Sequence, residues 1–393
     1  MAKIKVLIVD DSLVFGKFLT ENLPRVNPSI EIVGYASNPY DANLKIPKLN
    51  PDVISLDVEM PGMNGIEFLK KLLPRKPIPV VLVSSLNVGV FDALAFGAVD
   101  FVKKPDMSRE NSTGVFVKNL ATKLVIASCA RVRVPDFNRE VIPKNQDVAD
   151  VLNSGKKNRQ KEPVKANYAP VTENRNKGIA VPVVKPLSGY SYKGTPESNL
   201  KLNSTIIAIG ASTGGTEATL EILKNLPGDT PGTVITQHMP KGFTKMYAER
   251  LNKLCQMEVK EAEDGDEIRR GLALIAPGDL QMKVVKRNGK YFVSCRYDEK
   301  VSGHRPSVDV LFNSIAENVN GMKTVGVILT GMGQDGARGL LNMKKRGAYT
   351  IGQDKNTSVV YGMPMVAYNI GAVTKQASIG NICNIIVQHL NSL

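Results

Sequence analysis

The stretch Thr205–Ala218, TIIAIGASTGGTEA, decides how the second half of this chain folds. An apolar run leads directly into Gly-Ala-Ser-Thr-Gly-Gly, and residues typical of a helix follow, so the pattern predicts a strand, a tight turn and a helix. Ser212 lies in that turn, where few side chains crowd it and backbone N–H groups at the helix start point toward any anion. It is therefore a candidate nucleophile, which needs a base and an orienting carboxylate from elsewhere in the chain.

The turn also has two plainer interpretations. Residues 210–214, Gly-Ala-Ser-Thr-Gly, fit G-x-S-x-G, but many glycine-rich turns do so, and an ordinary strand-to-helix turn is one alternative. A phosphate-binding turn is the other, although the G-x-G-x-x-G spacing is absent and no Walker lysine follows. The choice depends on what the other strand ends supply.

Composition limits the class of protein. The 393 residues allow two or three domains, and 42% hydrophobic residues indicate a globular chain. No apolar run reaches the roughly 18–20 residues that span a bilayer. The first residues, MAKIKVLIVDDS, enter a strand without a signal peptide, so we expect a cytoplasmic protein with no membrane insertion.

The cysteine and histidine content argues against disulfides and a structural zinc site, and the net charge bears on binding to nucleic acid. The 4 cysteines lie far apart without a CxxC pair and the chain has 3 histidines, so we expect reduced thiols and no structural zinc site. A net charge of +14 permits binding to nucleic acid or to an acidic protein. No basic recognition helix stands out, so solubility and a basic linker explain the charge better, and we expect no nucleic-acid partner.

The chain divides into three parts: a first domain over 1–125, a linker over 126–200 and a second domain over 201–393. The linker is rich in Pro, Asn and Lys and has few apolar residues, so it cannot bury enough surface to order itself. In the first domain, strands and helices alternate as five βα units. The expected strands are Lys5–Val9, Ile30–Ala36, Val53–Leu56, Val80–Val83 and Val99–Val102. The expected helices are Leu13–Leu23, Tyr40–Leu49, Gly65–Leu73, Val90–Phe96 and Val115–Ala130.

The second domain resumes this alternation. Its apolar strands are IIAIG, TVITQ, LALIAP, TVGVILTG and YTIGQ, with helical patterns such as Glu217–Leu226 and Gly242–Leu254 between them. The run QMKVVKRNGKYFVSC is split at Asn288-Gly289, which indicates a hairpin. The fold class is therefore α/β, with two doubly wound parallel-sheet domains, the first flavodoxin-like and the second Rossmann-like with a β-hairpin insertion.

Polar side chains follow the strands of the first domain where each strand ends. Asp10 and Asp11 follow the first strand, Asp57 the third, Ser84 the fourth and Lys104 the fifth. Because parallel strands end at one edge of a sheet, these groups converge. Three carboxylates repel one another unless a hard cation such as Mg²⁺ or a lysine compensates. This arrangement suits phosphoryl transfer to Asp57.

The motifs LIVDDS, SLDVEMPGMNGIEFL, VLVSS and DFVKKP resemble the receiver domain of two-component response regulators. The resemblance covers residues 1–125 and implies that Asp57 is the phosphoacceptor. It implies a Mg²⁺ site made by Asp10 (through water), Asp11, Asp57 and the backbone carbonyl of Glu59. The residues that respond to phosphorylation would be Ser84, Phe101 and Lys104.

Strand ends of the second domain offer partners for Ser212. His238 ends the next strand, and Asp335 follows the strand TVGVILTG in a glycine-rich loop whose amides could form an oxyanion hole. His304, in SGHRPSVDV, is a rival base from a polar loop, and His389 near the C-terminus is a weaker one. Alpha/beta-hydrolases have the order Ser, Asp, His, so this order, Ser, His, Asp, does not indicate that fold.

The motifs IGASTGGTEA, TQHMPKGFT, SGHRPSVDVLF and LTGMGQDGARGL resemble the catalytic domain of the chemotaxis protein-glutamate methylesterases, the CheB family, over residues 203–390. By this resemblance Ser212 is the nucleophile, His238 the base and Asp335 the orienting acid. The Met332 amide would serve the oxyanion hole and Thr213 would line the site. His304 falls in a motif of structural or surface character.

The resemblance implies removal of methyl groups from γ-glutamyl methyl esters of chemoreceptors, deamidation of receptor glutamines, and phosphorylation by a CheA-type histidine kinase. The esterase chemistry needs no cofactor. We expect the unphosphorylated receiver to cover the Ser212 edge. Two alternatives remain: a response regulator whose second domain only binds a partner, and a general hydrolase of small esters.

Overall fold

The structure is a computed structural model that describes residues 3–84, 89–105, 112–132, 134, 192, 201–319 and 321–393. Its two α/β domains belong to one compact unit, which comprises Met1–Pro135 and Val184–Leu393. Most of the predicted linker lies outside the described residues. No helix in the described ranges is long and apolar enough to cross a membrane.

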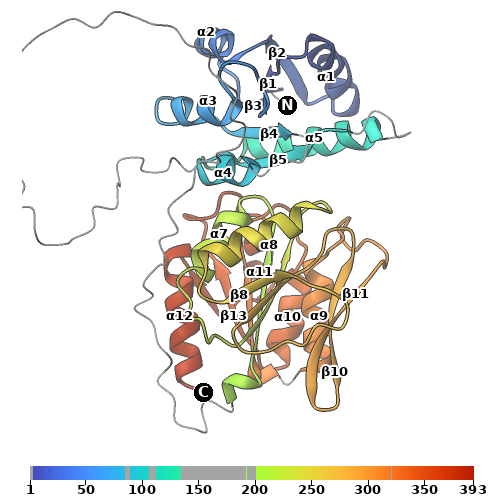
Figure 1. Ribbon diagram of the computed structural model, residues 1–393, viewed down its shortest axis with the longest axis vertical. Helices are drawn as coiled ribbons and strands as arrows, with labels where there is room; N and C mark the ends of the chain where they lie inside the picture. The colour runs from blue at the N-terminus through green and yellow to red at the C-terminus, as the bar shows by residue number, and fades with distance from the viewer. Residues whose placement is uncertain are drawn as a thin grey trace, which may run out of the picture. The chain divides into compact units, whose positions relative to one another are not determined.

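The first domain contains a parallel five-stranded sheet in the order β2-β1-β3-β4-β5 (Figure 1). Helix α1 packs with α5, and α3 packs with α4. Every side chain of β3 and β4 is buried because helices cover both faces of the sheet. The strands are β1 (Ile4–Val9), β2 (Ile30–Ala36), β3 (Val53–Asp57), β4 (Val80–Ser84) and β5 (Asp100–Lys103). The helices are α1 (Leu13–Val26), α2 (Pro39–Leu49), α3 (Gly65–Leu72), α4 (Gly89–Ala95) and α5 (Ser112–Ser128).

The flavodoxin-like prediction for this domain is confirmed, and each predicted strand is present. Two helix ends differ from the prediction by three residues: α1 was expected to end at Leu23, whereas it continues through Pro24 to Val26, and α5 begins at Ser112 where Val115 was expected. Proline usually ends or kinks a helix because it lacks the backbone N–H and its ring meets the preceding turn.

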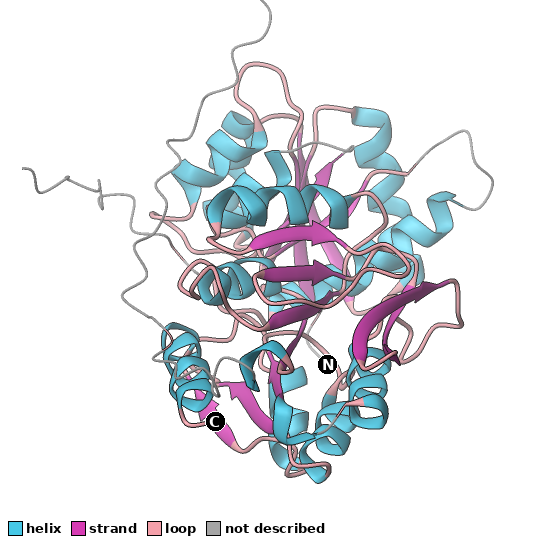
Figure 2. Cartoon of the chain, turned by 60° about the horizontal axis from the view of Figure 1, so that its bottom comes forward, coloured by secondary structure: helices cyan, strands magenta, loops and turns pink. Residues whose placement is uncertain are grey.

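The second domain contains a seven-stranded sheet in the order β14-β13-β12-β6-β7-β9-β8, with all neighbouring strands parallel. Helices α7, α8 and α12 pack together, as do α9, α10 and α11, and the strands lie between helices (Figure 2). The strands are β6 (Ile206–Ala211), β7 (Gly232–Gln237), β8 (Glu258–Glu261), β9 (Leu272–Ile275), β12 (Thr324–Ile328), β13 (Tyr349–Gln353) and β14 (Lys375–Ala377). The helices are α7 (Gly215–Leu223), α8 (Phe243–Leu254), α9 (Val308–Asn318), η1 (Gly321–Lys323, a 3₁₀ turn), α10 (Ala337–Lys345), α11 (Met363–Asn369) and α12 (Ile379–Asn391).

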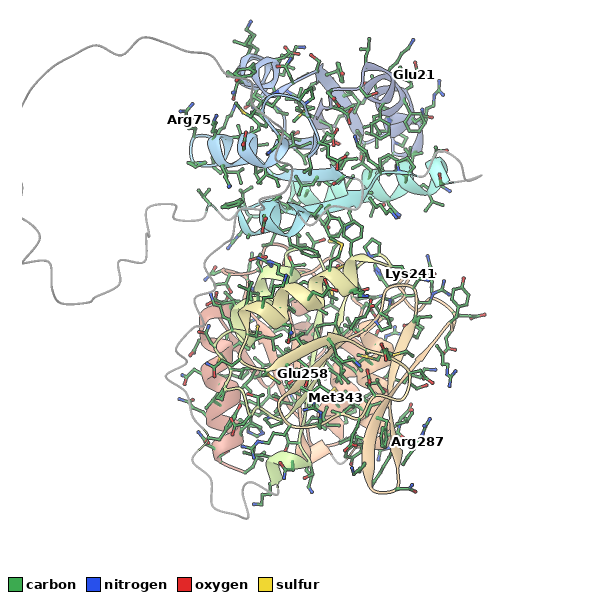
Figure 3. The ribbon with its side chains drawn as sticks, in the orientation of Figure 1. Glu21, Arg75, Lys241, Glu258, Arg287 and Met343 are labelled. Carbon is green, nitrogen blue, oxygen red and sulfur yellow. The ribbon has the colours of Figure 1, made fainter. Side chains whose placement is uncertain are left out.

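The predicted hairpin is present as β10 (Gln281–Arg287) and β11 (Lys290–Arg296), which pair with each other outside the seven-stranded sheet. Asn288 and Gly289 both have positive φ, 48° and 79°, which suits the two-residue turn expected of Asn-Gly. Arg287 lies at the turn end of the hairpin (Figure 3). The hairpin packs on α9, where the Ser314 hydroxyl accepts a hydrogen bond from the Val284 amide at 2.8 Å.

The strand order reverses beside β6, and this reversal positions the candidate site. The chain moves from β6 to β7 on one side and places β12 on the other side. In open α/β sheets, ligands bind at such a switch point, beyond the carboxyl ends of the strands. Ser212 follows β6, His238 follows β7, and Asp335 lies in the loop after β12.

Candidate functional site

Ser212 is fixed by its backbone in the turn between β6 and α7. Its N–H donates to the Thr330 carbonyl at 3.0 Å. Its carbonyl accepts from the Gly215 N–H at 2.7 Å and from Nε2 of Gln237 at 2.8 Å. Gly214 precedes the helix with φ of 76°, a conformation that glycine adopts without steric cost. The half-buried Ser212 therefore stands at the N-terminus of α7, where unpaired amides favour negative charge.

His238 reaches the same edge because β7 is the neighbour of β6. Ala211 pairs with Gln237 in the parallel register, and the His238 N–H donates to the Ala211 carbonyl at 3.0 Å. The next residue of each strand is therefore Ser212 on one side and His238 on the other. The expectation that adjacent strands bring these two residues to one edge is met by the backbone pairing.

His238 is hydrogen bonded to Asp335 through Nε2, which lies 2.8 Å from Oδ2 of the carboxylate. Nε2 therefore carries the ring proton of the neutral imidazole, and the lone pair lies on Nδ1. Nδ1 is buried and has no hydrogen-bond partner among the described residues. Within those residues no hydrogen bond joins Ser212 to Nδ1, so the imidazole has an unused acceptor beside the serine turn.

Asp335 is held by the first turn of α9. The Ser307 hydroxyl donates to Oδ1 at 2.7 Å, the Val308 N–H donates to Oδ2 at 2.7 Å, and the Asp309 N–H donates to Oδ1 at 3.1 Å. Burial by itself raises the pKa of Asp335, but hydrogen bonds from His238, Ser307 and Val308 outweigh that effect and hold the pKa below its ordinary value. The carboxylate is therefore ionised at neutral pH and can support a positive imidazole.

The glycine-rich loop after β12 lies against Ser212. A Cβ added to Gly331 would lie 2.7 Å from Cβ of Ser212, so only glycine allows this approach. The Gly331 carbonyl accepts from the Gly362 and Met363 amides at 3.0 and 2.8 Å, which fixes the loop. The next residue, Met332, has a side chain that is 50% exposed, and its N–H makes no hydrogen bond with the described residues. That free amide beside Ser212 can donate to an oxyanion.

Thr213, the other residue expected to line the site, is buried and directs its hydroxyl to Asp100 of β5, with 2.6 Å between Thr213 Oγ1 and Asp100 Oδ2. The other carboxylate oxygen, Oδ1, accepts from the Phe101 N–H at 2.7 Å and pairs with Lys123. A short chain of hydrogen bonds thus runs from the turn of Ser212 to the strand that carries Phe101.

His304 lies in a loop, as expected, and its ring is beside the candidate base. The ring stacks on that of His238, with centroids 3.7 Å apart and planes 7° apart, a contact that is compatible with the structural character implied by its motif. The pKa of His304 is lowered to about 4, mainly by burial. The neighbouring His238, Lys123 and Lys300 lower this pKa further, whereas the negative charge of Asp335 opposes the shift. His304 is therefore neutral at pH 7.

His389, the third histidine, lies on α12. It stacks on Tyr349, with ring centroids 4.2 Å apart, and burial lowers its pKa. Neither residue belongs to the loops that follow β6, β7 and β12. The structure thus leaves His238 as the histidine paired with a carboxylate.

The first domain gathers its acidic residues at the edge of its own sheet. Carboxylate oxygens of Asp10, Asp11 and Asp57 lie within 4.8 Å of one another. Lys104 Nζ lies 2.7 Å from Asp57 and 3.3 Å from Asp10. Burial raises the pKa of both aspartates, while Lys104 offsets part of that rise. Burial also disfavours the charged lysine, but its contacts with Asp57 and Asp10 outweigh this and raise the pKa of Lys104.

This acidic cluster fits a hard divalent cation. Three carboxylates faced by one ammonium leave two negative charges, and carboxylate oxygens are the donors that Mg²⁺ prefers. The Glu59 N–H donates to Asp57 Oδ1 at 3.1 Å, which places the Glu59 backbone beside the cluster. The Ser84 hydroxyl is buried without a partner among the described residues, and Phe101 is buried.

The sequence-based interpretation missed Ser307 and the start of α9. The residues that follow Ser307 give a detectable signal: Val308, Leu311, Phe312 and Ile315 are spaced for one apolar helix face behind a serine N-cap. The preceding Pro306 and the polar Ser-Gly-His-Arg run favour a loop, so they hide the start of the helix that fixes Asp335.

Comparison with known proteins agrees with this architecture. The family model of CheB methylesterases matches residues 207–386, and that of response regulator receiver domains matches residues 6–111. A protein-glutamate methylesterase/protein-glutamine glutaminase 2 from Syntrophomonas wolfei is 46% identical over 393 residues, covering 100% of this chain and 99% of the relative. The chain belongs to the CheB methylesterase family.

A second relative and a solved structure are also similar to this chain. A protein-glutamate methylesterase/protein-glutamine glutaminase from Sulfurimonas denitrificans is 45% identical over 383 residues, covering 96% of each chain. The crystal structure of the Thermotoga maritima CheB methylesterase catalytic domain is 40% identical, with a TM-score of 0.46, and covers 47% of this chain and 98% of that one. The two family models and the two relatives confirm, at the level of the family, both the receiver and the esterase resemblance drawn from the sequence motifs.

Proposed function

We infer that the chain is a phosphorylation-regulated protein-glutamate methylesterase and protein-glutamine glutaminase. The observation that carries the chemistry is the buried His238–Asp335 pair, joined at 2.8 Å, beside the serine turn at the switch point of the sheet. We propose that its substrates are γ-glutamyl methyl esters and certain glutamines on cytoplasmic parts of chemoreceptors. The catalytic part would be 201–393 and the receiver 1–125, joined by a linker over 126–200.

The proposed reaction begins with Ser212. Its Oγ attacks the ester carbonyl while His238 Nδ1 takes the hydroxyl proton, and Asp335 stabilises the resulting imidazolium through Nε2–H. The Met332 amide, with the N-terminal amides of α7, stabilises the oxyanion. His238 returns the proton to the leaving methoxide, methanol departs, and an acyl-enzyme remains. Water activated by His238 then releases free glutamate and restores Ser212.

The glutaminase activity follows from the same carbonyl chemistry. A glutamine side chain passes through the same tetrahedral oxyanion, and ammonia leaves in place of methanol. Because the γ-carbonyl, the nucleophile and the acyl-enzyme are common to both reactions, one set of residues serves both. A general hydrolase of small esters is not favoured, since the relatives carry both protein-directed activities in their names.

In the receiver, we propose that Asp57 accepts the phosphoryl group from a CheA-type histidine kinase. Asp10, Asp11, Asp57 and the Glu59 carbonyl would hold Mg²⁺, which when bound neutralises charge on the transferring phosphoryl group. Lys104, 2.7 Å from Asp57, would pair with a phosphoryl oxygen. Ser84, whose hydroxyl has no partner in the described part of the chain, would bind another phosphoryl oxygen, and Phe101 would respond to that change.

We further propose that the unphosphorylated receiver limits access to Ser212. The proposal is supported by the hydrogen bond from Thr213 to Asp100 and by the packing of Phe101 on Phe243, with ring centroids 4.6 Å apart. Both receiver residues are adjacent in β5, which ends at the acidic cluster. A rearrangement of Phe101 after phosphorylation would disturb these contacts and shift the population toward an accessible site.

The partners and the cellular location of the protein are also proposed. The net charge of +14 would attract receptor helices rich in glutamate, so added salt should weaken esterase activity on receptor. We propose a cytoplasmic protein that binds no nucleic acid. A second domain that only binds a partner is not favoured, because it would have no use for the buried His238–Asp335 pair.

The direct test is Ser212→Ala in the full chain, assayed with methylated receptor membranes and a phosphodonor. Methanol release and glutamine deamidation should both collapse, while phosphorylation of Asp57 and thermal unfolding stay unchanged. Ser378→Ala is the matched control, because Ser378 lies before α12 and makes no capping bond. Methanol release that survives in the Ser212→Ala protein would disprove the proposed chemistry.

A further inference from the structure

His304 lies against the site but takes no part in the steps above. Its ring is parallel to that of His238, with centroids 3.7 Å apart and an angle of 7° between planes. Hydrogen bonds of an imidazole lie in the plane of its ring, so two rings stacked face to face cannot pass a proton directly between them. His304 also has a pKa of about 4, which leaves it uncharged at pH 7. It therefore contacts His238 through its face, as neither a second base nor an acid.

The loop that carries His304 is fixed by its backbone. The His304 N–H donates to the Val301 carbonyl at 2.9 Å, and the His304 carbonyl accepts from the Val301 N–H at 3.1 Å. The same carbonyl accepts from Nε2 of Gln281 at 3.1 Å, and Oε1 of that buried glutamine accepts from the Ser307 N–H at 2.8 Å. The next residue, Arg305, donates to Asp279 Oδ1 at 2.6 Å. The ring nitrogens of His304 make no hydrogen bond with the described residues, so the loop sets the ring position.

One segment of chain thus acts on two members of the proposed triad. His304 covers the face of the His238 ring, and Ser307, only three residues later, donates to Asp335. Rotation of the His238 ring about its Cβ–Cγ bond would break the Nε2 contact with Asp335 and the stacking with His304 together. The hydrogen bond to Asp335 sets how the His238 ring is turned within its own plane, while the stacked His304 ring sets the orientation of that plane.

We propose that His304 is a positioning residue for the esterase reaction. Its ring holds the His238 imidazole with Nε2 on Asp335 and Nδ1 toward Ser212, and its π face stabilises the imidazolium that forms when His238 takes the proton of Ser212. The second effect is the attraction between a cation and an uncharged aromatic face, which is strongest away from water. The proposal rests on the proposed function, because it requires His238 to be the base.

The experiment compares His304→Ala, His304→Leu and His304→Phe in the full, phosphorylated chain, measuring kcat and KM for methanol release from receptor membranes. Loss of the aromatic face in the Ala and Leu proteins should lower kcat about tenfold and leave KM within about twofold. Phenylalanine keeps a flat aromatic face without ring nitrogens, so it should restore most of kcat. Leucine fills the space if alanine does not fold.

His389→Phe and His389→Ala are matched controls, because His389 also stacks on an aromatic ring, that of Tyr349, but lies on α12. They should retain the wild-type kcat. A wild-type kcat in folded His304→Leu or His304→Ala, a Phe protein as slow as the Leu protein, or a rise in KM alone would overturn the proposal. Failure of the proposed function itself would be distinguishable, since the Ser212→Ala protein would then keep its activity.

Discussion

The Ser307 side chain supports Asp335 but does not belong to the proposed triad. Removing its hydroxyl should therefore show how much the support of Asp335 contributes to stability and to catalysis. The Ser307→Ala change deletes a fully buried hydroxyl that donates to Asp335 Oδ1 at 2.7 Å and accepts from the Val310 N–H at 3.4 Å. The first bond, to a charged acceptor, is worth roughly 1.5–3 kcal/mol, and an N-cap is worth about 1 kcal/mol. We therefore expect the free energy of unfolding to fall by roughly 2.5–4 kcal/mol.

That loss converts to a measurable shift. For a domain of this size, 1 kcal/mol corresponds to about 2–4 °C, so the catalytic domain should melt roughly 5–15 °C lower. The Asp335–His238 bond uses the other oxygen, Oδ2, which keeps its Val308 N–H donor. The kcat should consequently fall only about tenfold, with KM unchanged, because Asp335 loses orientation but not its charge.

Calorimetry of the full chain and steady-state methanol release measure both effects. The matched control is Ser378→Ala, because Ser378 is a helix N-cap without a side-chain capping bond and should change neither quantity. If the Ser307→Ala protein has the same melting temperature as the Ser378→Ala protein and keeps the wild-type kcat, the argument that α9 holds the catalytic carboxylate is refuted.

Three further predictions concern the receiver, the metal and pH. A fragment of residues 201–393 should release methanol faster than the unphosphorylated full chain, and equal rates would disprove the covering role of the receiver. Chelation of divalent cations should abolish activation by a phosphodonor but leave that fragment unaffected; activation that persists would exclude the proposed Mg²⁺ site. Because the pKa of Asp335 is lowered on folding, its contribution to stability is present above the ordinary carboxyl pKa of about 3.9 and is lost as pH falls through the folded value. The stability advantage of wild type over Asp335→Asn in urea should therefore shrink below about pH 4, and a constant difference down to pH 2 would contradict this.

The strand ends could be predicted because buried parallel strands have a strong signal. Runs such as VISLD are buried throughout, consist mostly of apolar residues and end in a carboxylate, so Asp57 and Asp10 could be brought to one edge by topology alone. The same rule placed Ser212 beside His238, and the backbone register agrees. Periodicity therefore predicts which residues meet when each directly follows a central strand.

Other features depend on side-chain packing that no short pattern encodes. The strands β8, Glu258–Glu261, and β14, Lys375–Ala377, are short edge strands with polar residues, so they lack the apolar run that marks a central strand. The stacking of His304 on His238 depends on a loop fixed by Gln281, a residue more than twenty positions away. The orientation of the His238 ring likewise depends on which nitrogen meets Asp335.

The central claim is that Ser212 forms an acyl-enzyme common to both activities. The most direct test is to measure how that acyl-enzyme partitions between hydroxylamine and water. Wild-type enzyme would be given hydroxylamine with receptor that carries either the methyl ester or glutamine at the same position, and the ratio of hydroxamate to glutamate measured by mass spectrometry. The Ser212→Ala protein provides the background for each substrate. A shared intermediate predicts the same ratio from both substrates, above that background. Different ratios, or enzymatic glutamate formation without hydroxamate, would contradict the acyl-enzyme.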